Sequence, residues 1–446
     1  MSKHFKLIPV QILAIGFALI ILIGGILLSL PICNNGEISI SFLNGLFMST
    51  SATCVTGLGV VDTYSQFNFL GQLVIIILIQ IGGLGFMGVV TVFAFIARSK
   101  ISIYQRTILQ ESLGSPHIGG VVKIIRRMLI GTFLIESIGA FLIALRFIPR
   151  LGLWQGIWFG IFHSISAFCN AGFDLMGKFE EGSSLTLFTD DLFLEITTMV
   201  LIILGGIGFI VWNDVYNNRL KFSKYALHSK VMLSFTAFLI FGGAIMFFLL
   251  ERNCTLSGMS TGEQIMNSFF ISITPRTAGF ATVDYSNMST GGRLITMLFM
   301  FIGAGPGSTG GGIKVTTFVT LILSMYSNAK NYNDLSIYKR RLPADAQRKA
   351  FSSIASYIAP VIGCTFLLLL MNPTFTPESC LFESLSAMGT VGLTMGITPT
   401  LGSASKICIM VLMYSGRLGS ISIAIAIVRR KIIPKISYPE EKITLG

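Results

Sequence analysis

Charged residues are scarce in this chain, and their scarcity excludes most soluble folds. Asp, Glu, Lys and Arg together make up 12% of the 446 residues, whereas 52% are hydrophobic. Soluble domains carry roughly 25% charged residues, because their surfaces must be covered with polar groups. The composition therefore predicts a polytopic membrane protein rather than a string of soluble domains.

Cysteine and histidine are too few and too scattered to form a recognisable chemical site. The seven cysteines include no C-x-x-C pair, so neither a disulfide framework nor a zinc site is predicted. The four histidines are isolated from other metal ligands, and no Ser-His-Asp or paired-carboxylate arrangement emerges. We therefore expect no enzyme and no cofactor in this chain, and a structural role for His163.

Long apolar runs are what the sequence has in abundance. Runs of sufficient length to cross about 30 Å of hydrocarbon lie near residues 8–31, 70–97, 125–148, 191–212, 230–250, 293–325, 352–372 and 404–428. The net charge of +12 comes mostly from Lys and Arg in the short segments between them. This positive-inside pattern places both termini in the cytoplasm and speaks against a nucleic-acid partner. We expect eight transmembrane helices in the cytoplasmic membrane, in contact with lipid.

Four shorter apolar segments resemble one another, and a glycine lies near the end of each. They read FMSTSATCVTGL (47–58), FHSISAFCNAGF (162–173), FFISITPRTAGF (269–280) and FESLSAMGTVGL (382–393). A Phe precedes the glycine by ten residues in every segment, and a Ser precedes it by six residues in three of them. Matching positions at a fixed period indicate an internal repeat.

Each repeat is expected to contain a membrane helix, a half-helix, a glycine hairpin and a second membrane helix. Glycine-rich patches around Gly85, Gly307 and Gly419 follow the hairpins at similar distances and support this unit. The predicted divisions are residues 1–115, 116–225, 226–345 and 346–428, followed by a cytoplasmic tail at 429–446. The predicted fold is thus an all-α polytopic membrane protein with four repeats around a central ion pore.

The hairpins are too short to span a bilayer, so their backbone must line a cavity or be buried in protein. Glycine can turn successive carbonyl groups toward an axis, and rings of carbonyls replace the water shell of an alkali cation. The half-helix before each hairpin would point its partly negative C-terminus at that cation. Glycine in membrane helices usually serves close packing, but four glycines at matched positions favour a pore.

At these residues the chain resembles the Trk/Ktr/HKT superfamily of potassium transporters. The motifs TCVTGL, CNAGF, TPRTAGF and GTVGLT carry the resemblance, and GPGSTGGGIK with the tail YPEEKITLG is similar to the membrane subunit of Ktr systems. The first apolar run begins almost at residue 1, which also favours Ktr over Trk. The resemblance implies a potassium selectivity filter made of Val55, Thr56, Gly57, Asn170, Ala171, Gly172, Thr277, Ala278, Gly279, Thr390, Val391 and Gly392. In the related plant proteins a Ser in the first filter segment accompanies sodium transport, so Gly57 points to potassium.

The sixth apolar run contains too much glycine and proline to remain helical, so a break is predicted at residues 303–314. The resemblance implies that this loop is an intramembrane gate, formed by Gly305, Gly307, Ser308, Thr309, Gly310, Gly311, Gly312 and Lys314. The alternative is a broken helix that merely packs. Arg417 is expected to lie near the loop and to bind its backbone carbonyls, and otherwise to pair with a lipid headgroup or a buried acid. Glu136 is a candidate partner for Lys314 or Arg417.

The predicted function is potassium uptake through the translocating subunit of a Ktr-type system. The resemblance implies a homodimer docked on a cytoplasmic KtrA-like ring that binds ATP or ADP, with sodium as a possible coupling or activating ion. Candidate docking surfaces are the basic segments 98–127, 330–349 and 429–446. The alternative is a secondary carrier for a sodium-coupled or other small cationic solute. Carriers usually show inverted repeats, whereas these four repeats share one orientation.

Overall fold

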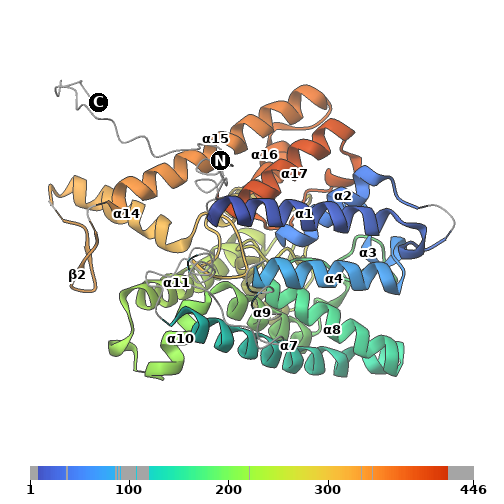
Figure 1. Cartoon of the computed structure of the whole chain (residues 1–446), viewed down its shortest axis with the longest axis horizontal. Coiled ribbons are helices and arrows are strands. Elements are labelled where there is room, and N and C mark those ends of the chain that lie inside the picture. The colour runs from blue at the N-terminus through green and yellow to red at the C-terminus, as the bar shows by residue number, and fades with distance from the viewer. Residues whose placement is uncertain are drawn as a thin grey trace, which may run out of the picture.

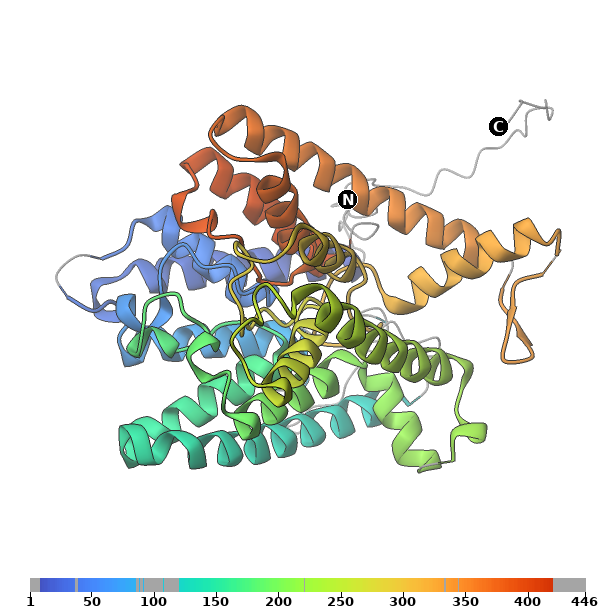
Figure 2. The same ribbon diagram turned by 180° about the vertical axis from the view of Figure 1, so that it is seen from behind.

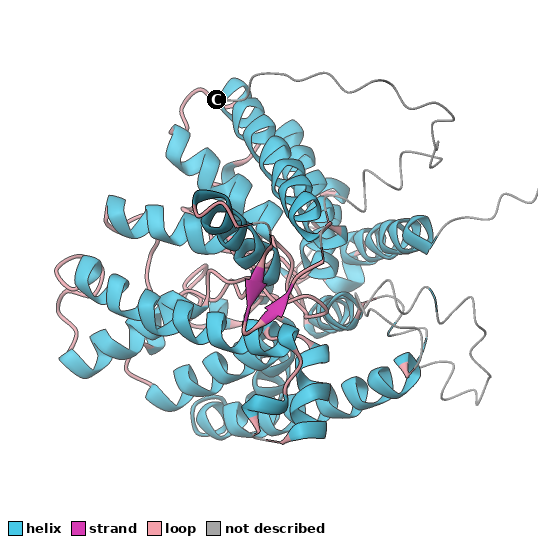
Figure 3. Cartoon of the chain, turned by 90° about the vertical axis from the view of Figure 1, so that its left-hand side faces the viewer, coloured by secondary structure: helices cyan, strands magenta, loops and turns pink. Residues whose placement is uncertain are grey.

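Helices make up nearly all of the regular structure in the computed structural model (Figure 1). The model describes residues 9–36, 39–85, 88, 91, 107, 120–219, 221–332, 334–343 and 345–419. Within these ranges the only strands are β1 (Ser336–Ile337) and β2 (Arg340–Arg341), which form a small antiparallel hairpin (Figure 3). Most of segment 98–119 and all of 420–446 lie outside the described residues, so the predicted docking surfaces there have no structural account.

Each repeat opens with a long apolar helix. These helices are α1 (Pro9–Ser29), α7 (Val121–Leu151), α11 (Leu227–Glu251) and α15 (Ala346–Met371). All four are long and apolar enough to cross a membrane. The predicted first span of every repeat is therefore present.

A shorter helix follows in each repeat and packs against the long one. These half-helices are α2 (Phe42–Cys54), α8 (Leu153–Cys169), α12 (Thr261–Ile273) and α16 (Pro377–Gly389). Polar caps define where three of them start: Ser41, Ser260 and Thr376 each accept a hydrogen bond from the first turn of their helix. Three of them end directly before a segment predicted to form the filter, and three residues separate the end of α12 from its segment.

In the described residues the second helix of each repeat breaks or ends at its glycine-rich patch. A break was predicted for the sixth span, whereas the break between α9 and α10 corrects the expectation of a continuous span at 191–212. The predicted spans 70–97 and 404–428 extend beyond the described residues. The helices are α4 (Phe69–Leu84), α9 (Leu192–Gly206) with α10 (Phe209–Asn218), α13 (Thr290–Phe301) with α14 (Val315–Ala329), and α17 (Ser403–Leu418). Helices α9 and α10 meet at 94°. Gly85, Gly208 and Gly419 lie at three of the ends with φ between +76° and +94°, a conformation that favours glycine. Among the described residues, four helices and the α9–α10 pair qualify as spans, so the number eight stays a prediction.

The four repeats close into a ring, with the last repeat beside the first. Figures 1 and 2 show α17 next to α1 and α2, although they lie at opposite ends of the sequence. Lys406 donates to Asn44 Oδ1 at 2.9 Å, and the Tyr414 hydroxyl donates to the carbonyl of Ala14 at 2.7 Å. Short elements complete the fold: α3 (Thr63–Gln66) and the 3₁₀ turns Pro31–Cys33, Met176–Lys178, Thr186–Phe188, Phe222–Lys224 and Thr398–Thr400.

Candidate ion pathway

Four glycine segments, residues 55–57, 170–172, 277–279 and 390–392, follow the half-helices. Val55, Asn170, Thr277 and Thr390 begin them with φ between +50° and +75°, in the left-handed region. Side chains other than glycine rarely adopt this conformation, and it persists only where the surroundings impose it. The glycines are recognisable in the sequence, whereas the left-handed turn at the first residue of each segment was not predicted. The turn reverses the chain at the end of each half-helix.

Hydroxyl groups hold the returning chain, which explains the serine that recurs six residues before the glycine. Ser51 Oγ accepts a hydrogen bond from Gly57 N at 3.1 Å, and Ser386 Oγ does the same for Gly392 N at 3.1 Å. In the second repeat Ser166 Oγ donates to the carbonyl of Phe173 at 2.6 Å. The third repeat has Ile273 at this position, and the neighbouring Thr274 donates to Phe280 instead, at 2.6 Å.

The four glycines face one another in cyclic order. A β-carbon placed on each would approach the carbonyl oxygen that precedes the next glycine: 2.5 Å from Ala171 for Gly57, 3.0 Å from Ala278 for Gly172, 2.6 Å from Val391 for Gly279, and closer still to Thr56 for Gly392. Such distances are shorter than ordinary van der Waals contacts, so no larger residue fits. The twelve residues predicted as a filter therefore come together around one centre.

The 303–314 loop lies directly against the first residues of the glycine segments. Gly311 N donates to Thr390 Oγ1 at 3.0 Å, and Thr309 Oγ1 donates to the carbonyl of Phe168 at 3.2 Å. A β-carbon on Gly310 would collide with the side chain of Thr277. The predicted break in the sixth span is confirmed, and the loop contacts the second, third and fourth repeats beside their glycine segments.

The loop is fixed on its other side by the break between α9 and α10. Gly305 N donates to the carbonyl of Gly206 at 2.9 Å, and Phe209 N donates to the carbonyl of Gly307 at 2.8 Å. Each broken span thus supplies hydrogen-bond partners for backbone groups that the other leaves free. Backbone at membrane depth requires such partners, since no water is present in the hydrocarbon to replace them.

Two positively charged side chains hold the loop through its carbonyl groups. Lys314 Nζ donates to the carbonyls of Gly310 at 2.7 Å and Gly311 at 3.3 Å. Arg417 donates through Nη1 to the carbonyl of Thr309 and through Nη2 to that of Gly82. The predicted contact between Arg417 and the loop backbone is confirmed. A cavity of about 290 Å³ opens beside them, lined by Pro306, Gly307, Ser308, Gly310, Gly312, Lys314, Gly416 and Arg417 among others.

Glu136 pairs with neither cation among the described contacts. Its carboxylate accepts from Gln80 Nε2 at 3.1 Å and lies 3.8 Å from the Cys169 sulfur, behind the second glycine segment. His163 has the expected structural role. Its Nε2 accepts from Leu175 N at 3.2 Å, so Nδ1 carries the proton and donates to the carbonyl of Phe159 at 2.7 Å.

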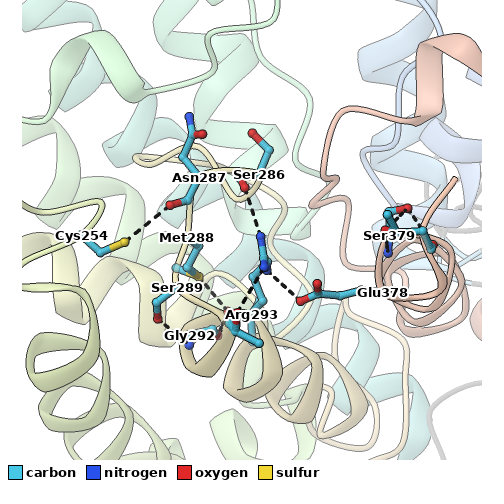
Figure 4. Close-up of polar contacts among 12 residues, drawn as sticks. Cys254, Ser286, Asn287, Met288, Ser289, Gly292, Arg293, Glu378 and Ser379 are labelled. Atoms are coloured by element: carbon cyan, nitrogen blue, oxygen red, sulfur yellow. Dashed lines mark hydrogen bonds and ion pairs between the residues drawn. The ribbon is translucent and has the colours of Figure 1, made fainter.

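An ion pair that the sequence analysis did not anticipate joins the third and fourth repeats (Figure 4). Arg293 Nε, near the start of α13, lies 2.7 Å from Glu378 Oε1, at the start of α16. Arg293 also donates to the carbonyl of Ser286 at 3.2 Å, so its guanidinium is held from two sides. No sequence pattern links these two residues, which are 85 positions apart, so their pairing could not be predicted.

Half-helices that end on a shared ring of non-helical backbone, enclosed by apolar helices, define a membrane transport protein rather than an enzyme. Comparison with known families agrees with this class. The chain belongs to the TrkH family of cation transport proteins, whose model matches residues 21–438.

Individual relatives extend over the whole chain. It is 41% identical to the potassium/sodium uptake protein NtpJ of Enterococcus hirae, over 99% of this chain and 98% of that protein. It is 38% identical to the Ktr system potassium uptake protein B of Bacillus subtilis, over 100% and 98%. The solved structure of the potassium transporter TrkH from Vibrio parahaemolyticus matches with a TM-score of 0.77 and 18% identity, covering 96% of this chain and 87% of that one. At that identity the structural likeness supports the fold alone.

Proposed function

We propose that this chain takes up potassium across the cytoplasmic membrane, as the translocating subunit of a Ktr-type system. The observation that carries the proposal is the cyclic ring of Gly57, Gly172, Gly279 and Gly392. A ring of backbone carbonyls suits a dehydrated alkali cation. Relatives over 30% identical along the full length are named potassium or potassium/sodium uptake proteins. The family and the four-repeat ring do not favour the secondary-carrier alternative.

The test is growth and ⁸⁶Rb⁺ uptake by a bacterium that lacks its own potassium uptake systems, with and without a co-expressed KtrA-like protein. We expect the chain to restore growth at low potassium, and Gly57→Ser and Gly279→Ser to weaken the rescue. Rescue that survives both substitutions, at equal protein levels in the membrane, would make the glycines packing residues. Failure with and without the partner would refute potassium uptake.

The 303–314 loop is proposed to gate this pathway, held closed by Lys314 and Arg417. Its contacts with Thr390 and Phe168 support the role, because a segment in that place obstructs passage beyond the ring. Shortening residues 305–311 should raise ⁸⁶Rb⁺ uptake without the partner. Unchanged or lost uptake in a folded variant would leave the loop as a packing element only.

The assembly around the pore is part of the proposal. We expect a homodimer, both termini in the cytoplasm, and a KtrA-like ring that carries the ATP or ADP, since relatives are named as parts of a Ktr system. Co-purification with that ring tests the partnership, and cross-linking in membranes tests the dimer. The name of the Enterococcus relative includes sodium, so uptake of ⁸⁶Rb⁺ with and without external Na⁺ tests sodium as a coupling or activating ion.

A further inference from the structure

Arg276 places a charge directly before the third glycine segment, and the other three segments have no charge at this position. It lies three residues before Gly279, and the corresponding residues in the other repeats are Cys54, Cys169 and Gly389. Three of the four positions are thus small and uncharged. The four-fold pattern of the ring is broken by a single arginine.

The Arg276 side chain is buried and has no carboxylate partner. Only 7% of the residue is exposed. Nη2 donates to Thr236 Oγ1 of α11 at 3.3 Å, while Nε is buried without a partner. No carboxylate in the described part of the chain lies within 4 Å of it. An uncompensated charge in a membrane protein interior is expensive, and stability alone does not explain it.

The backbone that carries this charge adjoins the proposed pathway. Arg276 directly precedes Thr277, the first residue of the third glycine segment, whose side chain touches Gly310 of the loop. Lys314 binds the carbonyl of that same Gly310 at 2.7 Å. Lys314 belongs to the loop that is proposed as the gate, whereas the Arg276 side chain extends toward α11, outside the loop. Its field therefore acts on an ion in the ring whether the loop is closed or displaced.

We infer that Arg276 is a specificity-determining residue that disfavours divalent cations in the glycine ring. This inference rests on the proposed uptake of potassium. The C-terminal ends of the half-helices attract cations through their partial negative charge, and Arg276 offsets that attraction in the third repeat. Coulomb repulsion from one fixed charge is twice as large for a divalent as for a monovalent ion. A single arginine at this place thus weakens binding of all cations, and of divalent cations most.

Ba²⁺ is the probe for this inference, because it has nearly the radius of K⁺ and twice its charge. We would measure ⁸⁶Rb⁺ uptake, with the KtrA-like partner present, while titrating Ba²⁺. The inhibitory Ba²⁺ concentration should fall about tenfold in Arg276→Met, and the half-saturating Rb⁺ concentration only about threefold, because the change in free energy doubles with ionic charge. Arg276→Lys should retain the native values. Arg252→Met, which removes an exposed arginine of the same repeat, is the matched control and should change neither value.

A second variant tests the inference even where Arg276→Met does not fold. Thr236→Glu places a carboxylate beside the Arg276 guanidinium and should sensitise uptake to Ba²⁺ in the same direction, whereas the neutral Thr236→Gln should not. Equal Ba²⁺ sensitivity in the native chain, Arg276→Met and Thr236→Glu would overturn the inference. Equal shifts for Rb⁺ and Ba²⁺ would also overturn it, because they indicate a change of shape rather than of charge. Absence of ⁸⁶Rb⁺ uptake by the native chain would instead refute the proposed function, and this inference with it.

Discussion

The closeness of the glycine segments can be tested with one added methyl group. In Gly279→Ala the new β-carbon would lie 2.6 Å from the carbonyl oxygen of Val391 in the next repeat. One of the two glycine segments must then move by about 1 Å to restore an ordinary van der Waals separation. Groups that bind an ion must be held within about 0.5 Å of the productive geometry. We therefore expect ⁸⁶Rb⁺ uptake to fall on the order of a hundredfold, as misplacements of about 1 Å do in other preorganised sites.

Backbone strain has to be separated from this collision, because Gly279 has φ of +82°. An alanine in such a conformation costs roughly 1–2 kcal/mol wherever it occurs. Gly258 provides the control: its φ is +88°, and a β-carbon there would meet nothing within 4 Å. Both variants should lose the thermal stability that this strain costs, and Gly279→Ala more because of its collision, but only Gly279→Ala should lose uptake. Equal uptake by the two variants would refute the proximity of the segments.

Three further outcomes follow from single contacts. Arg417→Gln loses the charged hydrogen bond to the loop carbonyl of Thr309, which contributes about 1.5–3 kcal/mol, so partner-free ⁸⁶Rb⁺ uptake should rise on the order of tenfold. His163→Phe leaves Leu175 N unpaired and should lower the free energy of unfolding by about 1–3 kcal/mol, seen as a lower Tm. Burial, and to a smaller extent the negative charge of Asp62, raises the pKa of Asp174 from 3.8 to about 6 in the loop between α8 and α9. The folded state thus holds the proton more tightly than the unfolded state, so ionisation of Asp174 lowers the free energy of unfolding progressively as pH rises from about 4 to 6. Asp174→Asn should therefore raise Tm at pH 7.5 but not at pH 4. An equal change in Tm at both pH values would contradict this.

Much of the candidate pathway could be predicted because its residues recur in an internal sequence repeat. The recurring glycines, the serine six residues earlier and the glycine-rich loop are local patterns, and the structure gives each a physical reason. Serine recurs because its hydroxyl fixes the returning chain, and Thr274 replaces it where Ile273 interrupts the pattern. The contact between Arg417 and the loop was also predictable, since charged side chains within membrane spans usually pair with backbone carbonyls or with acids.

What escaped prediction depends on which distant residues meet. Three-dimensional packing brings Arg293 to Glu378 and leaves Arg276 without a carboxylate partner among the described residues. It also separates Glu136 from Lys314 and Arg417. Hydropathy also suggested a continuous span at 191–212, because an average over an apolar window is insensitive to a single glycine. The 94° bend between α9 and α10 occurs where Gly208 adopts a positive φ that an average cannot register.

Closure of the ring by its last repeat has a consequence for how the protein is made. The contacts of Lys406 with Asn44 and of Tyr414 with Ala14 join residues 362 and 400 positions apart. At a synthesis rate of about 5–20 residues per second, the ribosome needs roughly 20–80 s to deliver the partner of Ala14. Until then α17, which joins the fourth repeat to the first, is incomplete. The ring is therefore closed only near the end of translation, so its earlier repeats must persist in the membrane without the neighbour that completes them.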